Sequence, residues 1–290
     1  MNILIIGTGS FSQALSHCLK NHKVSFLSRG KNQVLSYPVY NSFPDQVFDL
    51  IVLGIPRNAL SSFLQENRQK IHQIPLLFVS KGFDENNYYD PIQECPELKN
   101  QALYFLGPNL ASEIISSLPT YSVLCAYNPK LLSEFLPIFQ ENPFLHCEPS
   151  ESPKEILLGC ALKNIYTLGY GYIEKNESFN SSALYFVNSL EEIQKWYKVF
   201  SLEFHYSKAV IGDYFVSCIG PSRNKLYGLN FPNNSNHLVE GLNSLKNLYK
   251  QYTDSFYLQL CMLKGLAYLK TPASFQTFNS LILNETPLVG

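Results

Sequence analysis

The sequence predicts two domains, an α/β domain with a parallel sheet over residues 1–149 and an all-helical domain over residues 150–290. Three observations support this prediction. The chain of 290 residues exceeds the usual size of one domain, and its 46% apolar residues can fill more than one core. Short apolar runs alternate with amphipathic stretches in the first half, a pattern typical of a parallel sheet covered on both faces. After about residue 150, helical periodicity dominates.

In the first half, each expected element follows from local periodicity. We expect strands over residues 2–7, 24–27, 50–55, 76–80, 103–106 and 121–126. We expect helices over residues 10–20, 58–67 and 110–117. The strands are apolar along their whole length, which favours burial on both faces of the sheet.

In the second half, the residues Ser150, Glu151, Ser152 and Pro153 form a helix-start signal. We expect helices over residues 153–173, 183–200, 206–217, 238–252, 256–270 and 272–283. Residues 230–236 are rich in asparagine and predict a surface turn. Strand signals are nearly absent, so this domain is expected to be all-helical.

A glycine-rich turn follows the first strand directly. Gly7 permits a tight turn, and Gly9 lets the backbone approach a pyrophosphate at the N-terminus of the next helix, which starts at Ser10 and Phe11. Ser12 stands where the third glycine of this pattern is usual. A strand before the turn and a helix after it indicate a Rossmann-type dinucleotide site. The alternative is a tight turn without a ligand.

The end of the second strand bears on which coenzyme is bound. An NAD site usually has Asp or Glu about 20 residues after the glycines, where it binds the ribose hydroxyls. Here that position offers Ser28 and Arg29. An arginine suits a 2′-phosphate and favours NADP, whereas a solvated arginine in a turn is the alternative.

Two helices of the second half each contain one isolated charge. Lys163 is the only charged residue between Glu155 and Glu174, and Asp213 is the only one between Lys208 and Arg223. A buried lysine is costly unless it is paired, so these two side chains are expected to meet and to face a cleft with the first domain. Such a pair can transfer a proton. The alternative is a lysine that reaches solvent and an aspartate that caps a helix.

Further polar residues occupy positions suited to a ligand. Lys81 follows the strand at residues 76–80, and the carboxyl ends of parallel strands open onto the ligand crevice. Arg223 and Asn224 pair a planar guanidinium with a neutral amide, which suits a phosphate group.

Together these features resemble the glycerol-3-phosphate dehydrogenase family, which uses NAD or NADP. The matching blocks, in chain order, are Gly7-x-Gly9-Ser10-Phe11, Ser80-Lys81-Gly82, Gly107-Pro108-Asn109-Leu110-Ala111-Ser112-Glu113, Gly159-Cys160-Ala161-Leu162-Lys163-Asn164, Gly212-Asp213, Ser222-Arg223-Asn224 and Val239-Glu240-Gly241. Each block is short, but their order and spacing are specific.

The resemblance implies a role for each residue. Lys163 is implied to protonate or polarise the reacting oxygen, with Lys81 and Asp213 beside it as catalytic residues. Substrate contacts are implied for Asn164, Ser217, Arg223 and Asn224. Coenzyme contacts are implied for Gly7, Gly9, Ser10, Phe11, Ser28, Arg29, Lys81, Ala111, Arg223 and Glu240.

Composition excludes several other classes of function. The net charge is −1 and no basic stripe is present, so no nucleic-acid partner is expected. No apolar run approaches the length of a membrane span. Seven cysteines are scattered singly, without a CxxC pair, which indicates buried reduced thiols in a cytoplasmic protein. The histidines show no zinc-ligand spacing, and the oligomeric state is left open, a homodimer included.

The expected function is the reversible reduction of dihydroxyacetone phosphate to sn-glycerol 3-phosphate with NAD(P)H, with a preference for NADP(H). Two alternatives stay open. One is a related dehydrogenase acting on another small phosphorylated or acidic carbonyl compound. The other is a catalytically weak, dinucleotide-binding regulatory paralogue.

Overall fold

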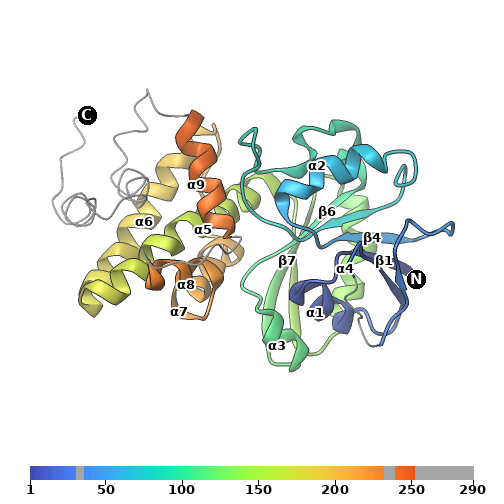
Figure 1. The fold of residues 1–290 in the computed structure, drawn as a ribbon, viewed down its shortest axis with the longest axis horizontal. Helices are drawn as coiled ribbons and strands as arrows, with labels where there is room; N and C mark the ends of the chain where they lie inside the picture. The colour runs from blue at the N-terminus through green and yellow to red at the C-terminus, as the bar shows by residue number, and fades with distance from the viewer. Residues whose placement is uncertain (31–35, 232–238, 252–290) are drawn as a thin grey trace. The chain divides into compact units, whose positions relative to one another are not determined.

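The structure of the protein, a computed structural model, describes residues 1–30, 36–231 and 239–251, and these form two compact units (Figure 1). The first unit comprises Met1–Ser80 and Asp90–Ile156. The second, which we call the helical unit, comprises Lys81–Tyr89 and the described residues from Leu157 onward. The predicted boundary between residues 149 and 150 stays a prediction, and it did not anticipate this excursion of Lys81–Tyr89. The helices expected over 256–270 and 272–283 lie outside the described residues.

Eight strands of the described chain form one sheet in the first unit. Their order across the sheet is β3-β2-β1-β4-β5-β6-β7-β8. Their bounds are Asn2–Ile6 for β1, Lys23–Leu27 for β2, Val39–Tyr40 for β3, Leu50–Leu53 for β4, Leu76–Phe78 for β5, Ala102–Leu106 for β6, Thr120–Ala126 for β7 and Leu145–Ser150 for β8. The six strands expected from sequence are confirmed, and β3 and β8 are additional.

The sheet is not parallel throughout, so the prediction of a parallel sheet is wrong for one strand pair. β6 and β7 are antiparallel, with Leu103 opposite Ala126, while the other neighbouring pairs are parallel. The link between these strands contains helix α3, Ala111–Ile115, which has five residues. Such a helix rises by about 7 Å, whereas a parallel crossover must return along a strand of about 17 Å.

Helices cover both faces of this sheet (Figure 1). Side chains of Ile3 and Ile5 share one buried cluster with residues of α1 (Ser10–Cys18), α3 and α4 (Pro129–Gln140). Helix α2, Arg57–Glu66, lies on the opposite side, with Leu60, Phe63 and Leu64 buried. Two short 3₁₀ turns, Pro91–Gln93 and Pro96–Gln101, precede β6. Burial of both faces explains why the strands are apolar along their whole length.

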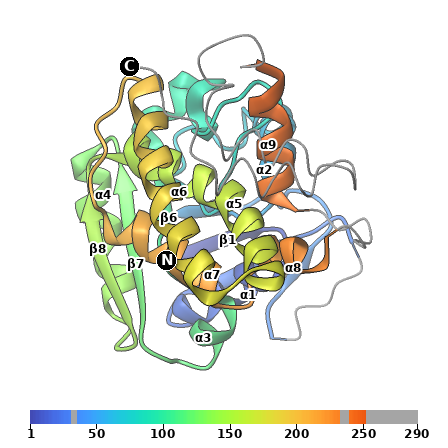
Figure 2. The same cartoon turned by 90° about the vertical axis from the view of Figure 1, so that its left-hand side faces the viewer.

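In the helical unit, Figure 2 shows α5 surrounded by the other helices. Helix α5 is Pro153–Asn176, and every residue from position 156 to 173 is buried. A helix that is apolar all round belongs in a core. The other elements are α6 (Phe179–Val199), a π-helical turn (Lys208–Gly212), α7 (Asp213–Ile219), α8 (Arg223–Asn230) and α9 (Glu240–Gln251). None of the helices in the described chain is long and apolar enough to span a membrane.

Candidate active site

The ammonium group of Lys163 and the carboxylate of Asp213 form a buried ion pair in the helical unit. Lys163 Nζ lies 3.0 Å from Asp213 Oδ1 and donates to Ser217 Oγ at 2.7 Å. Lys163 and Asp213 are 6% and 4% exposed. The predicted meeting of the two isolated charges is therefore confirmed, and the alternative of a solvated lysine and a capping aspartate is wrong.

Local helix geometry places the side chains of Lys163, Asp213 and Ser217 so that they meet. A π-helical turn, whose N-terminus is capped by Ser207, ends directly before Asp213, and single π-helical turns are frequent at functional sites. The expected continuous helix over residues 206–217 is thus interrupted there. Asp213 and Ser217 are four residues apart in α7 and share one face. Thr167, four residues after Lys163, donates its hydroxyl to the Lys163 carbonyl at 2.7 Å.

Lys81 completes the cluster from the segment Lys81–Tyr89. Its Nζ donates to Asp213 Oδ2 at 2.6 Å, so each oxygen of the carboxylate binds one lysine. The side chain of Lys81 is 14% exposed. Lys81 belongs to the same compact unit as α5 and α7. Three segments far apart in sequence therefore meet at the Asp213 carboxylate within one unit.

Charge pairing outweighs burial at this carboxylate. Burial by itself would raise the pKa of Asp213, but Lys163 and Lys81 hold that pKa below its ordinary value. Burial would likewise lower the pKa of Lys81, but Asp213 holds it above its ordinary value. Burial raises the pKa of the neighbouring Cys160 thiol to about 12, so this thiol stays protonated. Asp213 is therefore a fixed anion, and Lys81 a fixed cation.

Beside this cluster, a chain of amides joins α5, α8 and α9. Asn224 Nδ2 donates to Asn164 Oδ1 at 3.0 Å, and Asn224 Oδ1 accepts from the backbone N–H of Gly241 at 3.0 Å. Asn164 Nδ2 lies 3.5 Å from Glu240 Oε2. A Cβ on Gly241 would lie 2.1 Å from the carbonyl oxygen of Asn164, so only glycine allows this approach. Three residues implied by the resemblance thus form one network.

Arg223 lies at the exposed edge of this network. Its side chain is 76% exposed, and its guanidinium lies 3.5 Å from Glu240 Oε1, a loose contact. Arg223 is the first residue of α8, whose N-cap Ser222 accepts from the N–H of Lys225. The guanidinium is therefore available to an anion, while the neighbouring Asn224 is held by protein partners.

In the first unit, the turn after β1 has the features of a pyrophosphate site. Gly7 has a φ of +93°, and a Cβ there would lie 2.7 Å from the carbonyl oxygen of Gly54. A Cβ on Gly9 would meet no atom within 4 Å, so the backbone is open there. Helix α1 has no side-chain cap and no acidic residue in its first turn, which leaves the N–H groups of Ser10 and Phe11 to a ligand. These residues fit a dinucleotide.

Ser12 occupies the third glycine position without disturbing the packing. A Cβ on Gly54 would lie 2.0 Å from Ser12 Oγ, so the glycine directly after β4 provides the space that serine needs. The Ser12 hydroxyl donates to the Gly54 carbonyl oxygen at 3.3 Å. The substitution is therefore compensated on the facing strand.

The remaining predicted coenzyme residues lie at other loop ends of the first unit. Ser28 follows β2 and accepts from the N–H of Gly30 at 3.3 Å, and Arg29 is exposed. Ala111 is the first residue of α3, beside Asn109, whose amide donates to Ser122 at 2.9 Å. No group of three His, Cys, Asp or Glu side chains within the described residues is placed to hold a metal ion.

Two family models match this chain. The N-terminal model of NAD-dependent glycerol-3-phosphate dehydrogenase matches residues 45–132, the C-terminal model matches residues 155–264, and together they match more than half of the chain. The chain belongs to the NAD-dependent glycerol-3-phosphate dehydrogenase family. The site residues Lys81, Lys163, Asp213 and Arg223 lie within the matched segments, whereas the glycine turn precedes them.

A curated relative has the name of this family, and two solved structures share the fold of the chain. A curated relative from Ehrlichia ruminantium, named glycerol-3-phosphate dehydrogenase (NAD(P)+), is 28% identical over 86% of this chain and 89% of its own. The crystal structure of glycerol-3-phosphate dehydrogenase from Coxiella burnetii has the same fold, with a TM-score of 0.83 at 17% identity over 98% of this chain and 99% of its own. A Bacillus subtilis protein named probable 2-dehydropantoate 2-reductase has a TM-score of 0.60 at 15% identity, over 93% of this chain and all of its own.

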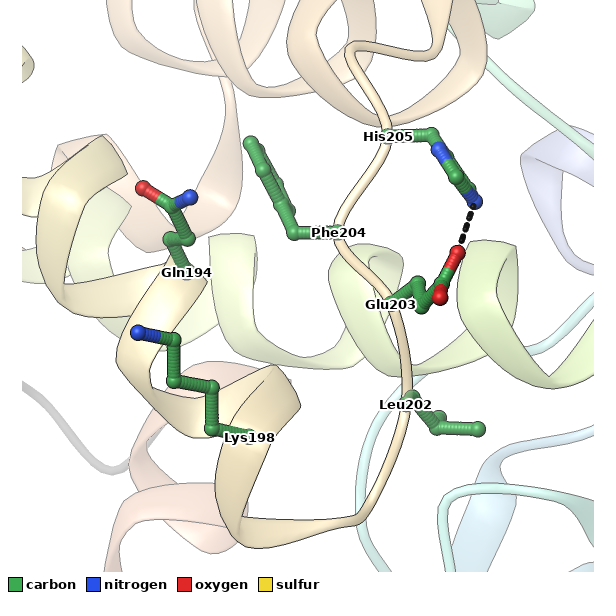
Figure 3. A pocket seen from close by; sticks show the side chains of 6 residues that line it. All are labelled: Gln194, Lys198, Leu202, Glu203, Phe204 and His205. Carbon is green, nitrogen blue, oxygen red and sulfur yellow. Dashed lines mark ion pairs between the residues drawn. The ribbon is translucent and has the colours of Figure 1, made fainter.

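A pocket elsewhere in the helical unit does not involve the family residues (Figure 3). It encloses about 340 Å³ and is lined by Gln194, Lys198, Leu202, Glu203, Phe204 and His205. Its ion pair, between Glu203 and His205 at 3.6 Å, is mostly exposed. We assign the site to the Asp213 cluster instead, because buried charges converge there and pocket size alone specifies no chemistry.

Sequence reasoning missed several residues that shape the site. Cys160 and Thr167 lie on α5 within one turn of Lys163, and their spacing of three and four residues could have indicated a shared face. Gly54 and Ser244 contact the site loops from distant parts of the chain. No local sequence signal marks such contacts.

Proposed function

We propose that this chain reduces dihydroxyacetone phosphate to sn-glycerol 3-phosphate with NAD(P)H, and catalyses the reverse reaction. The observation that carries the proposal is the buried carboxylate of Asp213 with one lysine on each oxygen. The family membership of the chain supports this reading of the cluster.

Lys163 is the proton donor to the carbonyl oxygen in this proposal. When bound, NAD(P)H supplies the hydride that the carbonyl carbon accepts. The carbonyl group becomes an alcohol, because its carbon accepts the hydride and its oxygen accepts a proton from Lys163 Nζ. Lys163 is left as a neutral amine until solvent restores the proton. Asp213 and Ser217 fix the position of that nitrogen at 3.0 and 2.7 Å.

Lys81 acts differently from Lys163. Because Asp213 holds the pKa of Lys81 above its ordinary value, Lys81 keeps its charge. Two lysines share one carboxylate, so the cluster offers excess positive charge to an oxygen that becomes negative. Lys81 thus stabilises charge, and Lys163 transfers the proton.

The substrate phosphate is bound by Arg223 in this proposal, with Asn164 and Asn224 as neighbouring amides. A guanidinium forms two parallel hydrogen bonds to a phosphate, and Arg223 is exposed and only loosely held by Glu240. The interlocked amides of Asn164 and Asn224 fix the start of α8, on which Arg223 stands.

The coenzyme residues are Gly7, Gly9, Ser10 and Phe11 for the pyrophosphate, with Lys81, Ala111, Arg223 and Glu240 as further contacts. Ser28 and Arg29 are the residues we assign to the 2′-phosphate of NADP(H). The Ser28 oxygen accepts from Gly30, so its hydroxyl hydrogen is free to donate to a phosphate oxygen.

The test is oxidation of NADPH or NADH by the purified chain with dihydroxyacetone phosphate, followed by coenzyme absorbance. We expect turnover by the wild type, and turnover that is at least about a hundredfold lower in Lys163→Ala. Coenzyme binding without turnover of this substrate would contradict the proposal and favour a related substrate or a regulatory paralogue. A homodimer and a cytoplasmic location are separate proposals, tested by light scattering and by cell fractionation.

A further inference from the structure

Helix α9 contacts both lysine-bearing segments of the cluster. Its first turn lies against α5, where Gly241 packs on the carbonyl of Asn164, the residue directly after Lys163. Its next turn lies against the segment Lys81–Tyr89, where Ser244 is 1% exposed. One rigid helix therefore bridges the backbone beside Lys163 and the backbone beside Lys81.

Two side chains of α9 bind the backbone just after Lys81. The N–H of Phe83 donates to Ser244 Oγ at 3.0 Å, and Asn247 Nδ2 donates to the carbonyl oxygen of Asp84 at 2.8 Å. Between them and Lys81 lies Gly82, with a φ of +118°. A Cβ there would lie 3.0 Å from Ser244 Oγ, so glycine permits both the turn and the approach of the helix.

The rest of the segment is packed so that a shift at Phe83 would move Lys81. Asp84 accepts from the N–H groups of Asn86 and Tyr88, which closes the following residues into a turn. The ring of Phe83 packs with Tyr89 and Phe200. Lys81 is two residues before Phe83, and its Nζ must reach Asp213 Oδ2 at 2.6 Å.

We propose that Ser244 and Asn247 are positioning residues for Lys81: their hydrogen bonds to Phe83 and Asp84 set the distance between the Lys81 ammonium and Asp213. This inference rests on the proposed function for its catalytic consequence. α9 holds the two lysines in register around one carboxylate, because it is fixed at Asn164 by its first turn and at Phe83 by its second.

The test compares Ser244→Ala with a matched control, Ser182→Ala. Ser182 is also a buried serine of the helical unit, 2% exposed, but its hydroxyl bonds to its own helix at Ser178. We expect Ser244→Ala to lower kcat by about tenfold or more, since a small displacement of a catalytic group is costly. The substrate KM should stay within about twofold, and the coenzyme Kd should change by less than kcat does, because Lys81 is one of several coenzyme contacts in the proposed function. Ser182→Ala should leave all three near the wild-type values.

A double-mutant cycle with Lys81→Ala separates positioning from general damage. If Ser244 acts through Lys81, Ser244→Ala changes kcat by less than about twofold once Lys81 is absent. Equal loss in both backgrounds, no loss in Ser244→Ala, or the same loss in Ser182→Ala would each overturn the inference. If Ser244→Ala does not fold, Asn247→Ala is judged by the same criteria.

A measurement without substrate keeps this inference distinct from the proposed function. The ε-carbon NMR signal of Lys81, assigned with Lys81→Arg, reports the pKa of the ammonium, which faces Asp213, Cys160 and Glu240. We expect that pKa to fall in Ser244→Ala, as Lys81 moves away from Asp213. An unchanged pKa would refute the positioning role, whereas a wild type that does not turn over dihydroxyacetone phosphate would refute only the proposed function.

Discussion

The hydroxyl of Ser12 lies 3.3 Å from the carbonyl oxygen of Gly54, and a methyl group on Gly54 would lie 2.0 Å from that hydroxyl. Serine in the third glycine position is thus tolerated because the residue directly after the facing strand β4 is glycine. The two residues form a matched pair at the base of the turn that approaches the coenzyme.

We predict that Gly54→Ala lowers the free energy of unfolding by about 1–3 kcal/mol, because the added methyl group overpacks a buried contact. It should also weaken coenzyme binding, since α1 is displaced. Adding Ser12→Gly should restore part of the stability and part of the coenzyme affinity. The loss that remains reflects the carbonyl oxygen of Ile6, which lies 3.2 Å from a Cβ on Gly54. Urea denaturation and coenzyme titration measure these effects. Gly9→Ala is the control: with open space around its Cβ it should weaken coenzyme binding while leaving stability nearly unchanged.

Lys163→Ala should lower kcat by a factor on the order of a hundred or more, the loss typical of removing a proton donor. The fold should survive, as judged by circular dichroism, because Lys81 still pairs with Asp213. Lys163→Arg should not rescue turnover, since a guanidinium does not release its proton. Near-normal turnover of Lys163→Ala would mean that Lys81 donates the proton.

Asp213→Asn should lower the free energy of unfolding at neutral pH by about 3–5 kcal/mol, because two lysines lose their buried partner. The pKa of Asp213 is lowered in the folded state, so its contribution is present above the ordinary value of 3.8 and is lost as pH falls through the folded-state pKa. The difference between wild type and variant should therefore shrink below about pH 3.8.

The contribution of Lys81 to the free energy of unfolding changes with pH in the opposite direction, and it does so at high pH. Its pKa is raised above 10.5 in the folded state, so its contribution is complete below that pH and is lost as pH rises through the folded-state pKa. Urea denaturation across both ranges checks the prediction. A difference between wild type and Asp213→Asn that does not vary with pH would contradict it.

Arg223→Ala should raise the substrate KM by more than it raises the coenzyme Kd, because in the proposed function the substrate phosphate is bound chiefly by this guanidinium, whereas the coenzyme has several other contacts. Loss of a charge-assisted phosphate contact costs about 1–3 kcal/mol, and the exposure of Arg223 places the effect toward the lower end. Dihydroxyacetone, which lacks the phosphate, should be an equally poor substrate for wild type and variant. Good turnover of this ketone by the wild type would exclude a phosphate site at Arg223.

The pairing of Lys163 with Asp213 could be predicted from sequence because each charge is isolated in an apolar helix. The contact of Lys81 with the same carboxylate could not be predicted in this way, since no periodicity in the sequence shows that residues 81–89 leave the first unit. The resemblance placed Lys81 in the site, and the structure provides its contact with Asp213 Oδ2. Sequence patterns thus identified the groups better than the path of the chain between them.

The elements missed from sequence have weak local signals. Helix α4 contains Pro137 in its interior, which argues against a helix, and β8 contains Pro149, which argues against a strand. Each is tolerated: α4 packs against β7 and β8, and β8 is an edge strand of the sheet. Helix α8 contains Gly228, a residue that disfavours a helix. Its lack of a side chain lets α8 lie close to α5, at the carbonyl of Leu168. Tertiary packing decides all three.

Arg29 supports the prediction that NADPH binds at least as tightly as NADH. No Asp or Glu follows β2 to bind the ribose hydroxyls or repel a 2′-phosphate. Arg29 is exposed, and Ser28 beside it has a free hydroxyl hydrogen. One arginine–phosphate contact contributes about 1–3 kcal/mol, roughly tenfold to a hundredfold in affinity before screening by salt.

The test compares the Kd values of NADPH and NADH for the wild type and for Arg29→Ala at two salt concentrations. The variant should lose affinity for NADPH but not for NADH, and the loss should shrink at high salt, because an exposed charge is screened. Lys23→Ala is a suitable control, since Lys23 is an exposed cation at the opposite end of β2. Equal loss for both coenzymes, or a wild type that prefers NADH, would exclude Arg29 as the 2′-phosphate residue.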